Sequence, residues 1–152
     1  MCKKLSAQDA ADSMYLHAGF KGGEIHAKYG PTIGWSQIEL ILADRTCVRH
    51  PCQVAFDSSR LEPGEVACAL ADGRLGEGSH TIYLHPYFRE RLDRAAWWVL
   101  YQLVVVNYGG FAVPADAEVF GANALGIGQE EYYEGLCRMA DDLAAATVGD
   151  TG

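Results

Sequence analysis

Hydrophobic and polar positions change their pattern near the middle of the chain. The first half alternates short apolar runs with glycines and prolines, which is typical of short strands, turns and loops. The second half contains residues 89–107, a segment without glycine or proline that begins with charges and then becomes apolar on every side. Such a long unbroken segment predicts a helix that is buried all round and ends at Tyr108-Gly109-Gly110.

Before this central helix, the pattern predicts one N-terminal helix followed by a long loop. Ser6 is a good N-cap, and the apolar positions after it predict a helix to about His17, where Gly19 ends it. Residues 19–34 are rich in glycine and predict a loop, interrupted by a short strand at residues 24–28.

Short apolar runs then predict a small sheet in the N-terminal half. Residues 37–43 fit either a strand or a short helix. Three further runs, residues 53–56, 65–70 and 81–84, predict strands because prolines and glycines bound them.

Two more helices are predicted after the central one, at residues 116–125 and 130–146. The fold class is therefore α+β, with a small N-terminal sheet packed on a buried central helix and further C-terminal helices. Because 152 residues are a normal length for one hydrophobic core, we expect residues 1–152 to form a single domain.

Composition narrows the classes of partner. The chain has 20 acidic and 12 basic residues, a net charge of −8, and no basic cluster larger than Lys3-Lys4, which argues against nucleic acid as a partner. The longest apolar stretch, residues 97–106, is too short to cross a bilayer, and the N-terminus lacks the apolar run of a signal peptide. We therefore expect a cytoplasmic protein that does not enter a membrane.

The cysteines and histidines do not indicate a metal site. The five cysteines include no CxxC pair, so we expect reduced and mostly buried thiols. His80 and His85 flank one predicted strand, but side chains five residues apart on a strand point to opposite faces.

The order of elements and two local motifs resemble a known family. The strand at residues 81–84, the long apolar helix, a glycine turn and a second helix reading DAEVFGANAL at residues 116–125 are similar to the core of the zincin metallopeptidases. Those enzymes carry HExxH on the first helix and an acidic metal ligand on the second, in a phrase like E-A-D-x-F-G-A-x-x-L. The resemblance covers roughly residues 80–127 and implies a zincin-like fold.

The residues that would bind zinc are replaced in this chain. In HExxH the two histidines share one helix face and hold the metal, while the glutamate activates the bound water. Tyr101 and Val105 stand at the histidine positions and Gln102 at the glutamate position. Valine has no lone pair to donate and glutamine is not a base near neutral pH. We therefore expect no metal, no other cofactor and no zinc peptidase activity.

Two acidic residues of the second helix keep their family positions. The resemblance matches Asp116 to the third metal ligand and Glu118 to the acidic residue that supports the site from behind. One carboxylate does not make a catalytic zinc site, which uses three protein ligands. Natural divergence and deliberate redesign would both produce this pattern.

Three functions remain open at this point. The first is a pseudoenzyme that binds a small ligand, a peptide or a protein partner in the former active-site cleft. The second is a metal-independent isomerase or cyclase that uses Asp116 or Glu118 as base and Tyr101 as hydrogen-bond donor. The third is a metalloenzyme with ligands from elsewhere in the chain.

The candidate cleft residues fall into two groups. Those that would carry chemistry are Tyr101, Gln102, Asp116 and Glu118. Those that would contact a ligand are Trp98, Val105 and Tyr83. The sequence leaves the oligomeric state and the identity of the ligand open.

Overall fold

The computed structural model describes residues 6–149, which form five α-helices and one small three-stranded sheet. The elements in chain order are α1 (Ala7–Tyr29), α2 (Trp35–Ala43), β1 (Cys52–Phe56), β2 (Ala67–Leu70), β3 (His80–Leu84), the 3-10 helix η1 (Pro86–Glu90), α3 (Leu92–Tyr108), the 3-10 helix η2 (Gly109–Phe111), α4 (Pro114–Leu125) and α5 (Gln129–Gly149). The mixed α+β class predicted from the sequence is confirmed.

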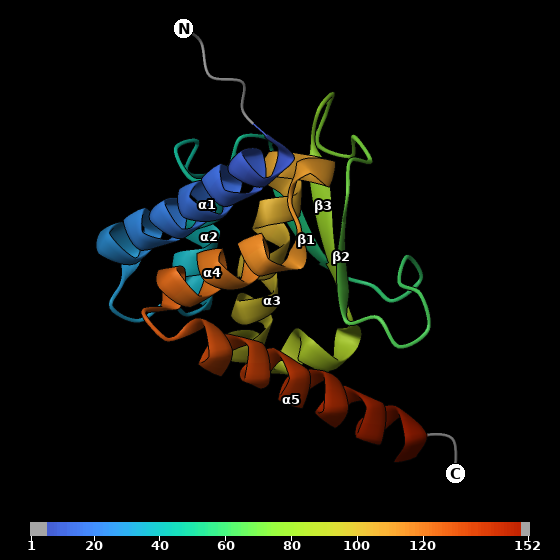
Figure 1. Ribbon diagram of the computed structural model, residues 1–152. Helices are drawn as coiled ribbons and strands as arrows, with labels where there is room; N and C mark the ends of the chain where they lie inside the picture. The colour runs from blue at the N-terminus through green and yellow to red at the C-terminus, as the bar shows by residue number, and fades with distance from the viewer. Residues whose placement is uncertain (1–5, 150–152) are drawn as a thin grey trace, which may run out of the picture.

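Helix α3 is the centre of the molecule. The sheet lies on one side of it, α4 packs on another side with α1 across it, and α5 runs below (Figure 1). Six residues spread along the helix have no solvent exposure: Ala95, Ala96, Val99, Leu100, Leu103 and Val104. The apolar surface that the sequence shows all around this segment is therefore buried against neighbours on several sides.

The sheet has the strand order β1-β3-β2, with β1 parallel and β2 antiparallel to β3. Side chains alternate along β3, so Ile82 and Leu84 belong to the main core. Tyr83 points the other way, and its hydroxyl donates a hydrogen bond to Asp72 at 2.5 Å. The strands predicted at residues 53–56, 65–70 and 81–84 are thus confirmed, with shifted ends.

The long N-terminal helix corrects the sequence prediction. Ser6 is the N-cap as expected, and it forms a capping box with Asp9. The predicted end near His17 and the short strand at residues 24–28 are wrong, because α1 continues to Tyr29. Of the loop predicted at residues 19–34, only residues 30–34 lie outside the helices. Gly22 lies at a close contact between α1 and α4. A Cβ atom on Gly22 would lie 2.3 Å from the carbonyl oxygen of Phe120. Glycine is therefore what lets α1 approach α4 this closely.

The remaining helices agree with the sequence apart from their ends. Residues 37–43, which fitted a strand or a helix, are helical in α2. Helix α3 begins at Leu92 rather than near residue 89, because the 3-10 turn η1 comes first. Within residues 6–149, no helix is long and apolar enough to cross a membrane.

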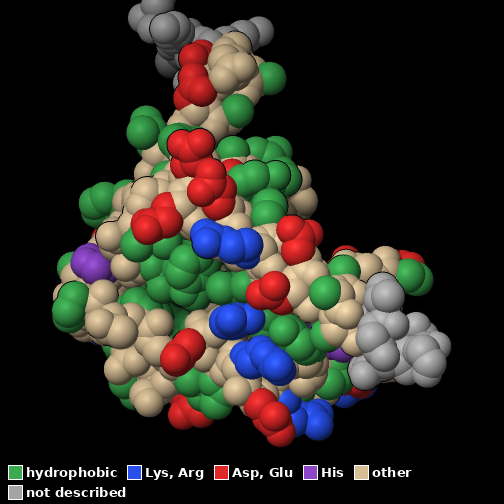
Figure 2. Space-filling model, turned by 90° about the horizontal axis from the view of Figure 1, so that it is seen from below, with side chains coloured by type: hydrophobic (Ala, Val, Ile, Leu, Met, Phe, Trp, Pro, Cys, Tyr) green, Lys and Arg blue, Asp and Glu red, His purple; other side chains and the backbone are tan. Residues whose placement is uncertain are grey.

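Helix α5 packs on the rest of the molecule through Tyr132 and Leu136 in its first half and through Leu143 in its second half. Tyr132 is fully buried, and its hydroxyl donates to the carbonyl oxygen of Trp97 at 2.6 Å. Seen from below, the face that includes α5 carries intermingled acidic and basic side chains, with Lys and Arg near its middle (Figure 2). One ion pair on this side joins Arg94 of α3 to Asp142 of α5 at 3.3 Å. This pair is about half exposed, so it contributes little to stability.

Candidate functional site

An open groove of about 410 Å³ lies where α3, α4 and α5 meet strand β2 and the residues before it. We call it the α3–β2 groove. It is lined by Trp98, Tyr101 and Gln102 of α3, Pro114 and Glu118 of α4, Tyr133, Leu136, Cys137 and Ala140 of α5, and residues 64–67. Its size lies within the range of ligand-binding pockets.

Four of the seven residues singled out from the sequence line this groove. Trp98, Tyr101 and Gln102 lie three and four positions apart, so they share one face of α3. Glu118 reaches the same groove from α4. The structure thus brings together two of the positions that match the HExxH motif and one acidic position of the second helix.

The other three residues lie outside the groove lining. Asp116 is 2% exposed, and its carboxylate accepts a hydrogen bond from the backbone N–H of Val113 at 2.9 Å. It therefore caps the N-terminus of α4. Val105 lies one turn beyond Tyr101 and is 37% exposed, and Tyr83 is buried on the opposite face of the sheet.

Gln102 connects the central helix to the strand. Its side chain is 8% exposed, and its Nε2 donates to the carbonyl oxygen of Ala67 at 3.5 Å, the long end of the hydrogen-bond range. The contact keeps a buried amide from being left without a partner, which would cost about 1–3 kcal/mol.

Strand β2 presents a free edge to this side of the molecule. The N–H of His85 donates to the carbonyl oxygen of Val66, so the backbone polar groups of Val66 face β3. Because these groups alternate in direction along an antiparallel strand, those of Ala67 and Ala69 point outward. No strand of residues 6–149 pairs with that outer edge.

The polar side chains of the groove offer both donors and an acceptor. Burial raises the pKa of Tyr101, and the negative charge of Glu118 raises it further. Tyr133 also has a raised pKa, first because of its hydrogen bond with Cys137. Both phenols therefore keep their protons near neutral pH and can donate hydrogen bonds, while a carboxylate at Glu118 can accept them.

Sequence reasoning missed the wall that α5 contributes. Helical spacing predicts Tyr133, Leu136 and Ala140 as part of the side of this helix that packs on the core, and it does not single out Cys137. Part of that side is exposed in the groove, since Tyr133 is 51% exposed, and Cys137 is exposed too. The one feature of the sequence that indicated this wall is the width of the apolar stripe on α5, which is more than one neighbouring helix can cover.

The described residues contain no preformed metal site. Within residues 6–149, no three side chains of His, Cys, Asp or Glu lie close enough together to hold a metal ion. Cys47, Cys52, Cys68 and Cys137 are free thiols.

No family model, curated protein or solved structure matches this chain. A function has therefore to be inferred from the chemistry of the groove itself.

Proposed function

We propose that this protein is a zincin-like pseudopeptidase that binds an extended peptide segment in the α3–β2 groove without cleaving it. The observation that carries the proposal is the meeting of three features in one groove. These are the free edge of β2, the substituted motif residues Tyr101 and Gln102, and an exposed apolar wall from α5.

The zincin-like part of the proposal rests on the sequence motif and on the layout of the elements. A strand, a buried helix and a second helix follow one another in β3, α3 and α4, in the order that the resemblance implies. Helix α3 lies against β2 and β3, and its Tyr101 and Gln102 share a groove with Glu118. This juxtaposition is what a former active-site cleft requires.

A peptide is the occupant that fits these features best. An extended chain can add to a free strand edge through main-chain hydrogen bonds, here to the outward N–H groups of Ala67 and Ala69 and the C=O of Ala69, because the C=O of Ala67 already accepts a hydrogen bond from Gln102. Leu136, Ala140 and Trp98 supply an apolar surface for one side chain of that peptide. The Tyr101 and Tyr133 hydroxyls and Glu118 are placed to hydrogen-bond its backbone.

Binding is favoured over catalysis by the position of the acidic residues. A metal-independent enzyme would use Asp116 or Glu118 as its base, and the carboxylate of Asp116 is committed to capping α4. The groove is also open rather than a closed pocket that excludes water, and it includes the half-exposed Tyr133. Retention of an intact peptide requires neither a base nor a dry site.

The proposal is tested with a library of N-acetylated, C-amidated hexapeptides that vary one central aromatic or aliphatic residue. We expect a subset to bind saturably and to shift the backbone amide signals of Ala67 and Ala69 in NMR spectra. Ala140→Phe fills the groove, so it should weaken binding roughly tenfold or more, about 1.4 kcal/mol. Ala145→Phe, an exposed site on the same helix outside the groove, should change the affinity less than twofold.

Thiol labelling gives an independent readout of the same groove. Bound peptide should slow alkylation of the exposed Cys137 by iodoacetamide. Cys52 serves as the internal control for unfolding, because burial raises its pKa to about 12 and leaves almost no reactive thiolate. Peptides that bind elsewhere, with Cys137 still reactive and Ala140→Phe unchanged, would refute the proposal, and so would hydrolysis of a bound peptide.

A further inference from the structure

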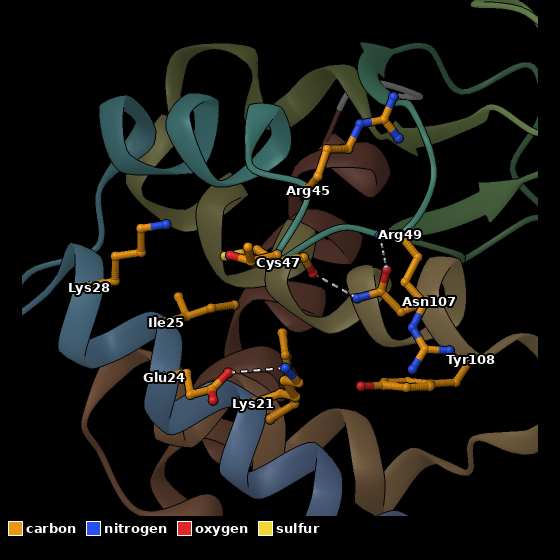
Figure 3. Close-up of a pocket in the computed structure, with 11 residues that line it drawn as sticks. Lys21, Glu24, Ile25, Lys28, Arg45, Cys47, Arg49, Asn107 and Tyr108 are labelled. Carbon is orange, nitrogen blue, oxygen red and sulfur yellow. Dashed lines mark hydrogen bonds and ion pairs between the residues drawn. The ribbon is translucent and has the colours of Figure 1, made fainter.

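A second cavity, of about 320 Å³, lies between α1, residues 45–49 and the C-terminal end of α3 (Figure 3). We call it the basic pocket, because Lys21, Lys28, Arg45 and Arg49 line it. It shares no lining residue with the α3–β2 groove. Nothing in the proposed function makes use of it.

The charge of this pocket is opposite to that of the chain. The protein carries a net charge of −8, yet four of its twelve Lys and Arg residues line this one cavity, against a single lining carboxylate, Glu24. Lys21 pairs with Glu24 at 3.1 Å, and Lys28 pairs with Asp44 outside the lining. Arg45 and Arg49 have no carboxylate within ion-pair distance among residues 6–149. The pocket is therefore left with uncompensated positive charge.

One of the unpaired arginines is held in place by aromatic contacts. The guanidinium of Arg49 lies 4.9 Å from the centroid of the Tyr108 ring, a cation–π geometry. His17 packs edge-on against the same ring, with the centroids 5.5 Å apart. The backbone N–H of Arg49 also donates to Asn107 Oδ1 at 2.9 Å. These contacts hold the backbone of Arg49 and the Tyr108 ring in place, with the guanidinium beside the ring.

The polar groups converge on one part of the cavity. Figure 3 shows the hydroxyl of Tyr108 pointing toward Lys21, with the guanidinium of Arg49 above the ring, while the side chain of Arg45 points away. The pKa of Tyr108 is raised, chiefly by burial, so the hydroxyl remains a hydrogen-bond donor near neutral pH. Lys21, Arg49 and Tyr108 thus present an ammonium, a guanidinium and a hydroxyl to the same space.

The cavity also has an apolar part. Ile25 of α1 and Phe120 of α4 line it, and both are almost fully buried. Burial raises the pKa of the nearby Cys47 thiol, which keeps it uncharged. A ligand suited to this cavity would combine an anionic head with a small apolar body.

We infer that the basic pocket binds a small phosphate monoester, with the phosphate held by Lys21, Arg49 and Tyr108 and the apolar group against Ile25 and Phe120. A phosphate monoester carries close to two negative charges at neutral pH, which suits two cations better than a monovalent carboxylate does. Arginine binds phosphate oxygens through two parallel N–H donors. The small extent of the cavity and the acidity of the rest of the chain are unsuited to a nucleic acid strand, which needs an extended basic surface.

The test is calorimetric titration of the full chain with phenyl phosphate, inorganic phosphate and benzoate. Phenyl phosphate should bind saturably and at least about threefold more tightly than either of the others, because it alone satisfies both parts of the cavity. Arg49→Gln should weaken the binding of phenyl phosphate roughly tenfold. Lys21→Gln should weaken it by a similar factor, because Lys21 holds the same phosphate from α1. Arg138→Gln is the matched control, because it removes the same charge from an exposed side chain that lines neither cavity, and it should change the affinity less than about threefold.

Three results would overturn the inference. They are no saturable binding of phenyl phosphate up to about 10 mM, binding of benzoate as tight as that of phenyl phosphate, or an unchanged affinity in both Arg49→Gln and Lys21→Gln. Arg49 and Lys21 are surface side chains, and the urea midpoint of each variant reports whether its fold is kept. If phosphate binding in the basic pocket is refuted, the proposal that a peptide binds in the α3–β2 groove still stands, because the two sites have no lining residue in common.

Discussion

Gly22 and Gly23 are neighbours in α1 with opposite surroundings, and they give a sharp test of the packing between α1 and α4. A Cβ atom on Gly22 would meet the Phe120 carbonyl oxygen at 2.3 Å, whereas one on Gly23 would meet nothing within 4 Å. Gly22→Ala should therefore destabilise the protein by about 1–3 kcal/mol through overpacking. Gly23→Ala should stabilise it by about 0.5–1 kcal/mol, because alanine loses less conformational entropy in a helix.

Urea unfolding midpoints of Gly22→Ala and Gly23→Ala measure these two opposite changes in stability. Equal stabilisation by both substitutions would mean that α1 and α4 do not approach each other as closely as described. A lower midpoint for Gly23→Ala would instead contradict the helical state of α1 at this position.

Single residues also show where sequence reasoning about the site succeeded and failed. Tyr101 and Gln102 lie on the same side of α3 as Trp98, which precedes them by three and four positions, and helical spacing alone predicts that relation. The role of Asp116 could not be assigned, since its carboxylate turns back to the start of its own helix rather than into the groove. The sequence permits both orientations, and only the backbone around Val113 distinguishes them.

At the scale of elements, the sequence predicts best where the local signal and the tertiary contacts agree. Helix α3 has no glycine or proline and is apolar all round, so a buried helix was the natural prediction. Helix α1 contains three glycines, Gly19, Gly22 and Gly23, which locally favour a loop. Its continuity depends on packing against α4, for example on the hydrogen bond between His26 and the carbonyl oxygen of Ala124, 98 residues further along the chain. Local propensity cannot report such a contact.

The junction between α1 and α2 predicts a pH dependence of stability. Asp44 follows α2 and accepts hydrogen bonds from Lys28, Tyr29 and Thr46, and these contacts hold the pKa of its carboxyl well below the usual range. A carboxyl with a lowered folded-state pKa stabilises the fold above its unfolded pKa, near 3.9, and this stabilisation is lost as the pH falls below that value.

Asp44→Asn should accordingly destabilise the protein at pH 7 by about 1 kcal/mol, a magnitude kept small because Lys28 is exposed. The difference from the unsubstituted protein should be constant from about pH 7 to about pH 4 and should shrink between about pH 4 and about pH 2, because the carboxyl takes up a proton there in the unfolded chain while it stays ionised in the folded protein. Urea denaturation at several pH values measures it. A difference that stays constant down to about pH 2 would show that charge at Asp44 does not hold the two helices together.

At the scale of the whole molecule, the layers around α3 predict an order of local stability. Helix α3 is enclosed by the sheet and by other helices, so its amide protons should exchange only when the protein unfolds globally. Helix α5 is anchored by Tyr132 in its first half, and Leu143 is the one buried residue among residues 141–147. Its second half should therefore open locally and exchange faster than any segment of α3.

Hydrogen exchange followed by mass spectrometry tests this order and ties it to the groove. The α5 residues that line the groove, from Tyr133 to Ala140, lie between the anchored and the weakly held halves of the helix. A peptide bound beside β2 would add contacts to that stretch, so its exchange should slow while that of α3 stays unchanged. Exchange at residues 141–147 as slow as in α3 would show that the far half of α5 is packed as firmly as the centre, and that the groove wall is rigid before any ligand binds.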